Sequence, residues 1–90
     1  MSVADQAIED TILDLARARG EGKTICPSEA ARALSGDRPE QWSPLMPRIR
    51  LTAIRLMKEG RITIRRKGRA VDPDDFRGIY RIAICNDPER

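Results

Sequence analysis

The sequence predicts a single α+β domain in which three helices come first and a basic pair of strands follows. Apolar residues recur every three or four positions in the first two thirds of the chain and every second position near its end. Ninety residues, 40% hydrophobic and 34% charged, suit one globular domain with one modest core. We take the domain as 1–90, with an ordered core of about 3–85 and a frayed tail over 86–90.

The first helix is expected over residues 3–19. Ile8 and Ile12 belong to an apolar stripe with helical spacing, and acidic residues gather in the first half, near the positive end of the helix dipole. Ser2 is the expected N-cap. Gly20 is expected to end the helix, since glycine readily takes the backbone conformation of a helix terminus.

A short strand at Thr-Ile-Cys and a second helix follow. Pro27 is well placed to open this helix and Gly36 to end it. Residues 37–43 are expected to form a loop with Trp42 as its only large apolar group. We expect Trp42 to plug the core and fix the loop there.

The third helix is expected over about residues 44–59, with Ser43 as its cap and Pro44 at its first position. Pro47 moves the start of the regular helix later if it interrupts the first turn. Gly60 is expected to end the helix. Its predicted outer face carries three cations with a leucine among them, namely Arg48, Leu51, Arg55 and Lys58.

Two strands close the chain, one in RITIR and one in GIYRIAI, each with alternating apolar residues. The connection KGRAVDPDDFR is too long for a two-residue hairpin turn, so a long irregular loop is expected, anchored by Phe76. Three carboxylates in this loop have two interpretations. They either bind a divalent cation or, as we favour, cap backbone amides in turns and pair with neighbouring arginines: Asp72, Asp74 and Asp75.

The order of these elements is that of a winged helix-turn-helix, with three helices packed on a small antiparallel β-hairpin or three-stranded sheet. The segments ICPSEAARAL, LMPRIR, EGRI, RKGRAVDPDDFRG and YRI also resemble a small bacterial family known only as a domain of unknown function. The resemblance covers roughly residues 7–84. It implies a winged-helix fold and no particular activity.

Several function classes are disfavoured by composition. The chain has no histidine and no glycine-rich phosphate loop, so we expect no enzyme, no cofactor, no metal and no small-molecule substrate. Cys26 and Cys85 are read as separate buried thiols. No stretch is apolar enough to span or bind a membrane, and no secretory signal precedes the helices. A cytoplasmic monomer is expected.

Positive charge is concentrated in the middle of the chain. The net charge is −3 over residues 1–40, +8 over 41–71 and −2 over 72–90. This segregation favours binding to duplex DNA through the third helix and the loop between the strands, the wing. The alternative is a protein-interaction module with an acidic partner on the same helix. The expected nucleic-acid contacts are Arg48, Arg55, Lys58, Arg65, Arg66, Lys67 and Arg69.

Overall fold

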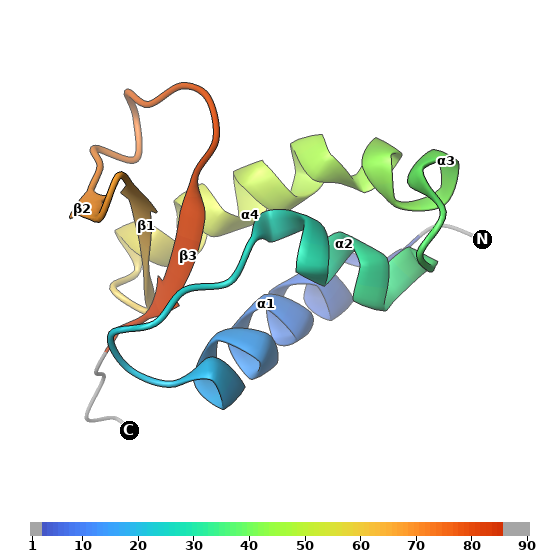
Figure 1. Cartoon of the computed structure of the whole chain (residues 1–90), viewed down its shortest axis with the longest axis horizontal. Coiled ribbons are helices and arrows are strands. Elements are labelled where there is room, and N and C mark those ends of the chain that lie inside the picture. Colours follow the sequence, from blue (N-terminus) through green and yellow to red (C-terminus); the bar gives the residue numbers. More distant parts are fainter. Residues whose placement is uncertain (1–2, 86–90) are drawn as a thin grey trace.

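The computed structural model describes residues 3–85 and shows three principal helices and a three-stranded antiparallel sheet, so the predicted α+β class is confirmed. Figure 1 shows the three helices grouped together and the small sheet at one end of the molecule. The order and layout are consistent with a winged-helix-like arrangement. The elements are α1 (Asp5–Arg19), α2 (Pro27–Ser35), α3 (Pro39–Trp42), the 3-10 turn η1 (Ser43–Leu45), α4 (Met46–Lys58), β1 (Ile62–Arg66), β2 (Arg69–Ala70) and β3 (Arg81–Ile84).

The first two helices end where the sequence predicts. Gly20 and Gly36 are the C-caps, with φ of 101° and 98°. α1 begins two residues later than predicted, after the extended residue Ala4, which caps it without a side-chain bond. The predicted cap Ser2 and the predicted frayed tail 86–90 lie outside the described residues.

The regular third helix starts between the two positions predicted for it, Pro44 and Pro47. In place of one helix from residue 44, the chain forms the one-turn α3, then η1, and α4 starts only at Met46. Pro39, Pro44 and Pro47 explain the division, because proline favours the start of a helical segment but cannot donate the hydrogen bond that continues one. The predicted loop 37–43 therefore contains a short helix.

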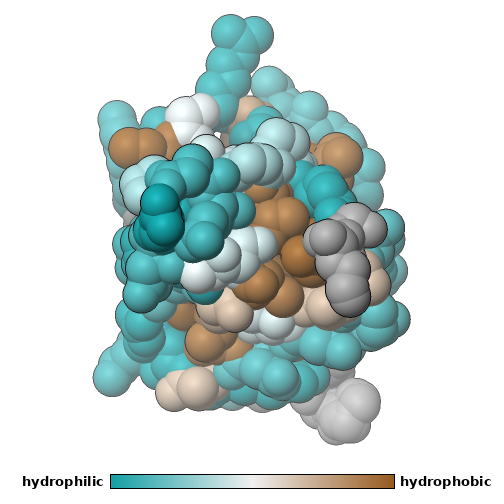
Figure 2. All heavy atoms as spheres, turned by 90° about the vertical axis from the view of Figure 1, so that its right-hand side faces the viewer, coloured by the Kyte–Doolittle hydropathy of each residue, from teal (hydrophilic) through white to brown (hydrophobic). Residues whose placement is uncertain are grey.

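Trp42 is less deeply buried than predicted. It is half-buried, packs against the core from one side and has the Arg32 guanidinium 5.9 Å from its ring centroid on the other. Figure 2, which views the side of the molecule where α3 lies, shows apolar side chains at the centre of this face among hydrophilic ones. Some apolar surface thus remains open on this side.

The sheet has the order β2-β1-β3, and β1 pairs with β3 from Ile62↔Ile84 to Arg65↔Arg81. Ile25 forms a bridge to Ile82 on the far edge of β3, which confirms the predicted stub strand. Alternation places the side chains of Ile62 and Ile64 in the core, where both are buried. The sheet is thereby joined to the helices through one apolar face.

The prediction of one long irregular loop after β1 was wrong. The chain turns at once at Lys67 and Gly68, whose φ angles are 53° and 81°, and pairs back as β2. Two consecutive positive φ angles are typical of the two-residue turns that match the twist of a hairpin. We call residues 62–70 the basic hairpin. An irregular segment, residues 71–80, then leads to β3.

The core lies between α1, α2, α4 and the inner face of the sheet. α2 contributes the small buried side chains of Ala30 and Ala31. The fully buried large side chains come from α1, α4, the sheet and the stub strand: Ile8, Ile12, Ile25, Ile49, Leu56, Ile62, Ile64 and Ile82. Among the described residues, no helix has the length and apolarity needed to cross a bilayer. The buried apolar side chains form one continuous cluster, which holds the helices and the sheet together.

A matched pair of leucines on α4 tests this core. Leu56 is fully buried, whereas Leu51, on the same helix, keeps 67% of its surface exposed. We expect Leu56→Ala to lower the free energy of unfolding by about 2–5 kcal/mol, because it leaves a cavity in the core. Leu51→Ala should stay within about 0.5 kcal/mol of the wild type. Urea denaturation followed by circular dichroism measures both, and equal losses would contradict the assignment of the core.

Candidate nucleic-acid interface

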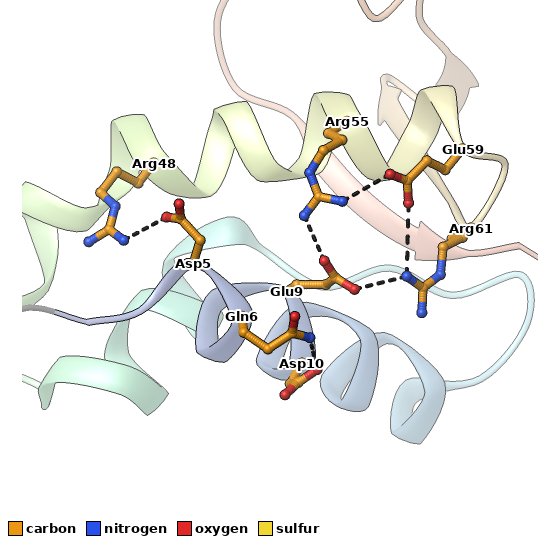
Figure 3. Close-up of polar contacts among 8 residues, drawn as sticks. All are labelled: Asp5, Gln6, Glu9, Asp10, Arg48, Arg55, Glu59 and Arg61. Carbon is orange, nitrogen blue, oxygen red and sulfur yellow. Dashed lines mark hydrogen bonds and ion pairs between the residues drawn. The ribbon is translucent and has the colours of Figure 1, made fainter.

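The predicted cation row on α4 faces carboxylates of α1. Arg48 Nη2 lies 2.7 Å from Asp5 Oδ1 and also donates to the carbonyl oxygen of Val3. Figure 3 shows Arg48 and Arg55 both pointing from α4 towards the acidic side chains of α1. Two of the three predicted contacts on this helix are thus engaged within the protein.

Glu9 is the centre of a larger ion cluster. Its carboxylate oxygens lie 2.6 Å from Arg55 Nη2 and 2.9 Å from Arg61 Nη1, and Arg55 also binds Glu59 at 2.9 Å (Figure 3). Only 13% of the Glu9 side chain is exposed. The hydrogen bond from Arg55, with further help from Arg61, lowers the pKa of Glu9 despite its burial. The same pairing raises the pKa of Arg55.

The third predicted cation of the helix, Lys58, has its Nζ 2.7 Å from Asp74 Oδ1 in the segment 71–80. All three helix cations are therefore neutralised locally. Leu51, between Arg48 and Arg55, is open to solvent as predicted, and together with Asp5 and Thr52 these residues line a shallow groove of about 270 Å³.

The cations of the basic hairpin have a different environment. Arg65, Lys67 and Arg69 make no ion pair with any residue over 3–85. The register also opposes like charges directly, Arg66 to Arg69 and Arg65 to Arg81. Directly opposed like charges destabilise a sheet, by roughly 0.2–1 kcal/mol each. The hairpin thus carries uncompensated positive charge.

One arginine of each opposed pair, Arg66 in the first and Arg81 in the second, has a hydrogen-bond partner. Arg66 Nε donates to the carbonyl of Ile79 at 2.8 Å, and Arg81 Nε donates to Thr24 Oγ1 at 2.8 Å. Among the seven predicted contacts, the described part of the chain therefore leaves three without a polar partner. These three are Arg65, Lys67 and Arg69.

The aspartates of the segment 71–80 form turns, as favoured from the sequence. Asp72 Oδ1 accepts from the amide of Asp74 at 2.9 Å, and its carbonyl accepts from the amide of Asp75. The predicted pairing with neighbouring arginines was wrong, because the ion pair of Asp74 is with Lys58 on α4. No cluster of three potential metal ligands occurs over residues 3–85.

Sequence reasoning missed the role of Arg50. Its guanidinium lies 3.9 Å from the centroid of the Phe76 ring and donates to the Phe76 carbonyl at 2.7 Å. Phe76 is buried and anchors its loop, as predicted. Arg50 and Phe76 are 26 residues apart in the sequence, so no local sequence pattern predicts their contact. Arg77, also absent from the predicted contacts, is exposed and has no ion pair with a described residue.

A second hollow, of about 350 Å³, lies beside the C-terminal end of the segment 71–80. Its walls are almost entirely apolar. Tyr80 lines it, and burial raises the pKa of this tyrosine to about 12. The predicted absence of a disulfide is confirmed, but Cys26, in the same wall, and Cys85 are half-buried rather than buried thiols. The wall consists of Cys26, Pro27, Met46, Gly78, Ile79 and Tyr80.

The fold and surface define a small basic α+β domain with a tight hairpin that carries three cations without an ion pair among the described residues. Residues 5–85 match the model of a family described as a protein of unknown function (DUF3253). The match spans nearly the whole chain, so the protein belongs to this family and the resemblance predicted from the sequence is confirmed. No curated protein matches the chain.

The Glu9 cluster gives a pH-dependent prediction. Because the pKa of Glu9 in the folded protein lies below its ordinary value of 4.5, its ion pairs stabilise the protein above that pH. The contribution is lost as the pH falls through the lower, folded-state pKa. We expect Glu9→Gln to lower the free energy of unfolding by about 1–2 kcal/mol at pH 7, with the difference from wild type shrinking below about pH 4.5.

Urea titrations of both proteins between about pH 3 and 7 measure this difference. Glu21→Gln is the matched control, since Glu21 is exposed in the loop after α1 and forms no ion pair within 3–85. A Glu9→Gln difference that stays constant down to the lowest pH would show that the carboxylate charge does not stabilise the fold.

Proposed function

We propose that this protein is a winged-helix module that binds duplex DNA, and that the basic hairpin is its wing and principal contact. The observation that carries the proposal is the set of three hairpin cations without a carboxylate partner among the described residues: Arg65, Lys67 and Arg69. We further propose that it acts as a monomer in the cytoplasm.

The charge arrangement supports a polyanionic ligand. Two arginine pairs stand directly across neighbouring strands, Arg66 with Arg69 within the hairpin and Arg65 with Arg81 on β3, so their repulsion is relieved when an anion lies beside them. The phosphates of duplex DNA form a dense row of negative charge, and Lys and Arg bind them by releasing counterions. Contacts of this kind position a protein on DNA without reading its sequence.

The ion pairs of α4 argue for a hairpin-led mode of binding. A phosphate reaching Arg48 or Arg55 has to displace a carboxylate that is already 2.6–2.7 Å away. Exchanging one charge partner for another yields little net energy. The helix that sequence reasoning favours for base recognition therefore adds less to affinity than the hairpin does in this proposal.

The dependence of DNA affinity on salt tests the proposal. Three phosphate contacts predict a log–log slope of about −2.7, and replacing Arg65, Lys67 or Arg69 by glutamine should reduce its magnitude by about 0.9. Fluorescence anisotropy with a labelled random duplex, over about 20–150 mM salt, measures the slope for wild type and for Arg69→Gln. The control is Arg48→Gln, which removes an equal charge from the helix and should leave the slope nearly unchanged.

Two results would contradict the proposal. One is the absence of binding at the lowest salt concentration. The other is a slope that Arg48→Gln reduces and Arg69→Gln does not, because this places the phosphates on α4 instead of the hairpin.

A second candidate function is binding of an acidic protein partner to α4. The exposure of Leu51 between two arginines favours it, since a leucine beside a glutamate in a partner segment suits both neighbours. A peptide of alternating glutamates and leucines should then shift the amide signals of residues 48–58 and leave 65–69 unaffected. Leu51→Ala should abolish this response. Duplex DNA should give the opposite distribution, so the two functions are separable in one titration.

A further inference from the structure

We infer that Arg66 is a positioning residue that braces the basic hairpin against residues 78–79 and does not itself bind phosphate. The inference rests on the proposed function and deepens it, because it assigns different roles to two arginines that stand opposite each other in the same hairpin. The pair is Arg66 on β1 and Arg69 on β2.

The direction of the Arg66 side chain comes from the pleat of β1. Every second residue of a strand points to the same face, so Arg66 shares the face of Ile62 and Ile64, which is the core face. Its guanidinium accordingly turns towards the body of the domain, and Nε donates to the Ile79 carbonyl at 2.8 Å. The residue is half-buried.

The partner segment is shaped to receive this guanidinium. A Cβ placed on Gly78 would stand only 3.1 Å from Arg66 Nη2, which is closer than most real contacts of this kind. Gly78 also has a φ of +82°, a conformation that residues with a side chain rarely adopt. Glycine at this position thus permits both the turn and the close approach of Arg66.

The hairpin needs such a brace because its own pairing is short. β2 contains only two residues, and two-stranded hairpins are marginally stable by themselves. The hydrogen bond of Arg66 joins the end of β1 to Ile79, 13 residues later, in the segment that leads into β3. Arg69, in contrast, is exposed and has no polar contact within 3–85, so its charge remains available to a phosphate.

Salt titrations of matched variants separate the two roles. We expect Arg66→Gln to weaken DNA binding about fivefold to tenfold at every salt concentration while leaving the log–log slope unchanged, because no phosphate contact is lost. Arg69→Gln should reduce the magnitude of the slope by about 0.9. If Arg66→Gln reduces the slope by the same amount, Arg66 is a phosphate contact and the inference is overturned.

A measurement without DNA keeps this inference distinguishable from the proposed function. Amide hydrogen exchange of Val71, which donates to the Ile64 carbonyl, reports the closure of the hairpin. Exchange should become severalfold faster in Arg66→Gln and Gly78→Ala, and stay at the wild-type rate in Arg69→Gln. Gly22→Ala controls for backbone strain, since Gly22 has a similar φ of +79° but open space around it.

The outcomes then separate cleanly. Wild-type protein that fails to bind DNA refutes the proposed function, while the exchange rates still decide whether Arg66 braces the hairpin. Unchanged Val71 exchange in both Arg66→Gln and Gly78→Ala refutes the brace, whatever the DNA result.

Discussion

Packing of the acidic α1 against the basic α4 is the constraint that decides where positive charge is left on this protein. The first 40 residues carry a net charge of −3 and the next 31 carry +8. Folding brings these stretches together, and Glu9 joins α1 both to α4, through Arg55, and to the entry of β1, through Arg61. Much of the helix charge is therefore neutralised inside the protein. The basic hairpin, in contrast, keeps three cations that have no ion pair with a described residue: Arg65, Lys67 and Arg69.

Most of the fold was predictable because its signals are local. Glycines mark the ends of α1 and α2, Pro27 marks the start of α2, and alternation identifies β1. The start of the regular third helix could be predicted only as Pro44 or Pro47, because the sequence does not rank its closely spaced prolines as starting points; α4 starts between them, at Met46. The two-residue turn was missed because the next strand was expected only from residue 78, nine residues after the start of β2, although Gly68 is the kind of residue that such turns favour.

The candidate site was predictable only in part. Composition located the cations, but whether each has a partner depends on contacts between residues far apart in the sequence. Arg48 with Asp5 and Arg55 with Glu9 are more than 40 residues apart. A helical wheel shows which side chains share a face, but it does not show which other elements pack against that face. Lys67 and Arg69 are exposed because the turn and the edge strand β2 have few neighbours, whereas Arg65 and Arg66 on the central strand β1 are half-buried. Arg66 differs from the other three in its contact with residues 78–79.

The position of Trp42 has a practical consequence. It is the only tryptophan of the chain, and α3, which ends with it, lies at the opposite end of the molecule from the basic hairpin (Figure 1). Its half-buried ring rests on the core beside Arg32, so its emission will follow global unfolding. Events confined to the hairpin will leave that emission almost unchanged. The fluorescence of Trp42 thus reports global unfolding and does not respond to ligand binding at the basic hairpin.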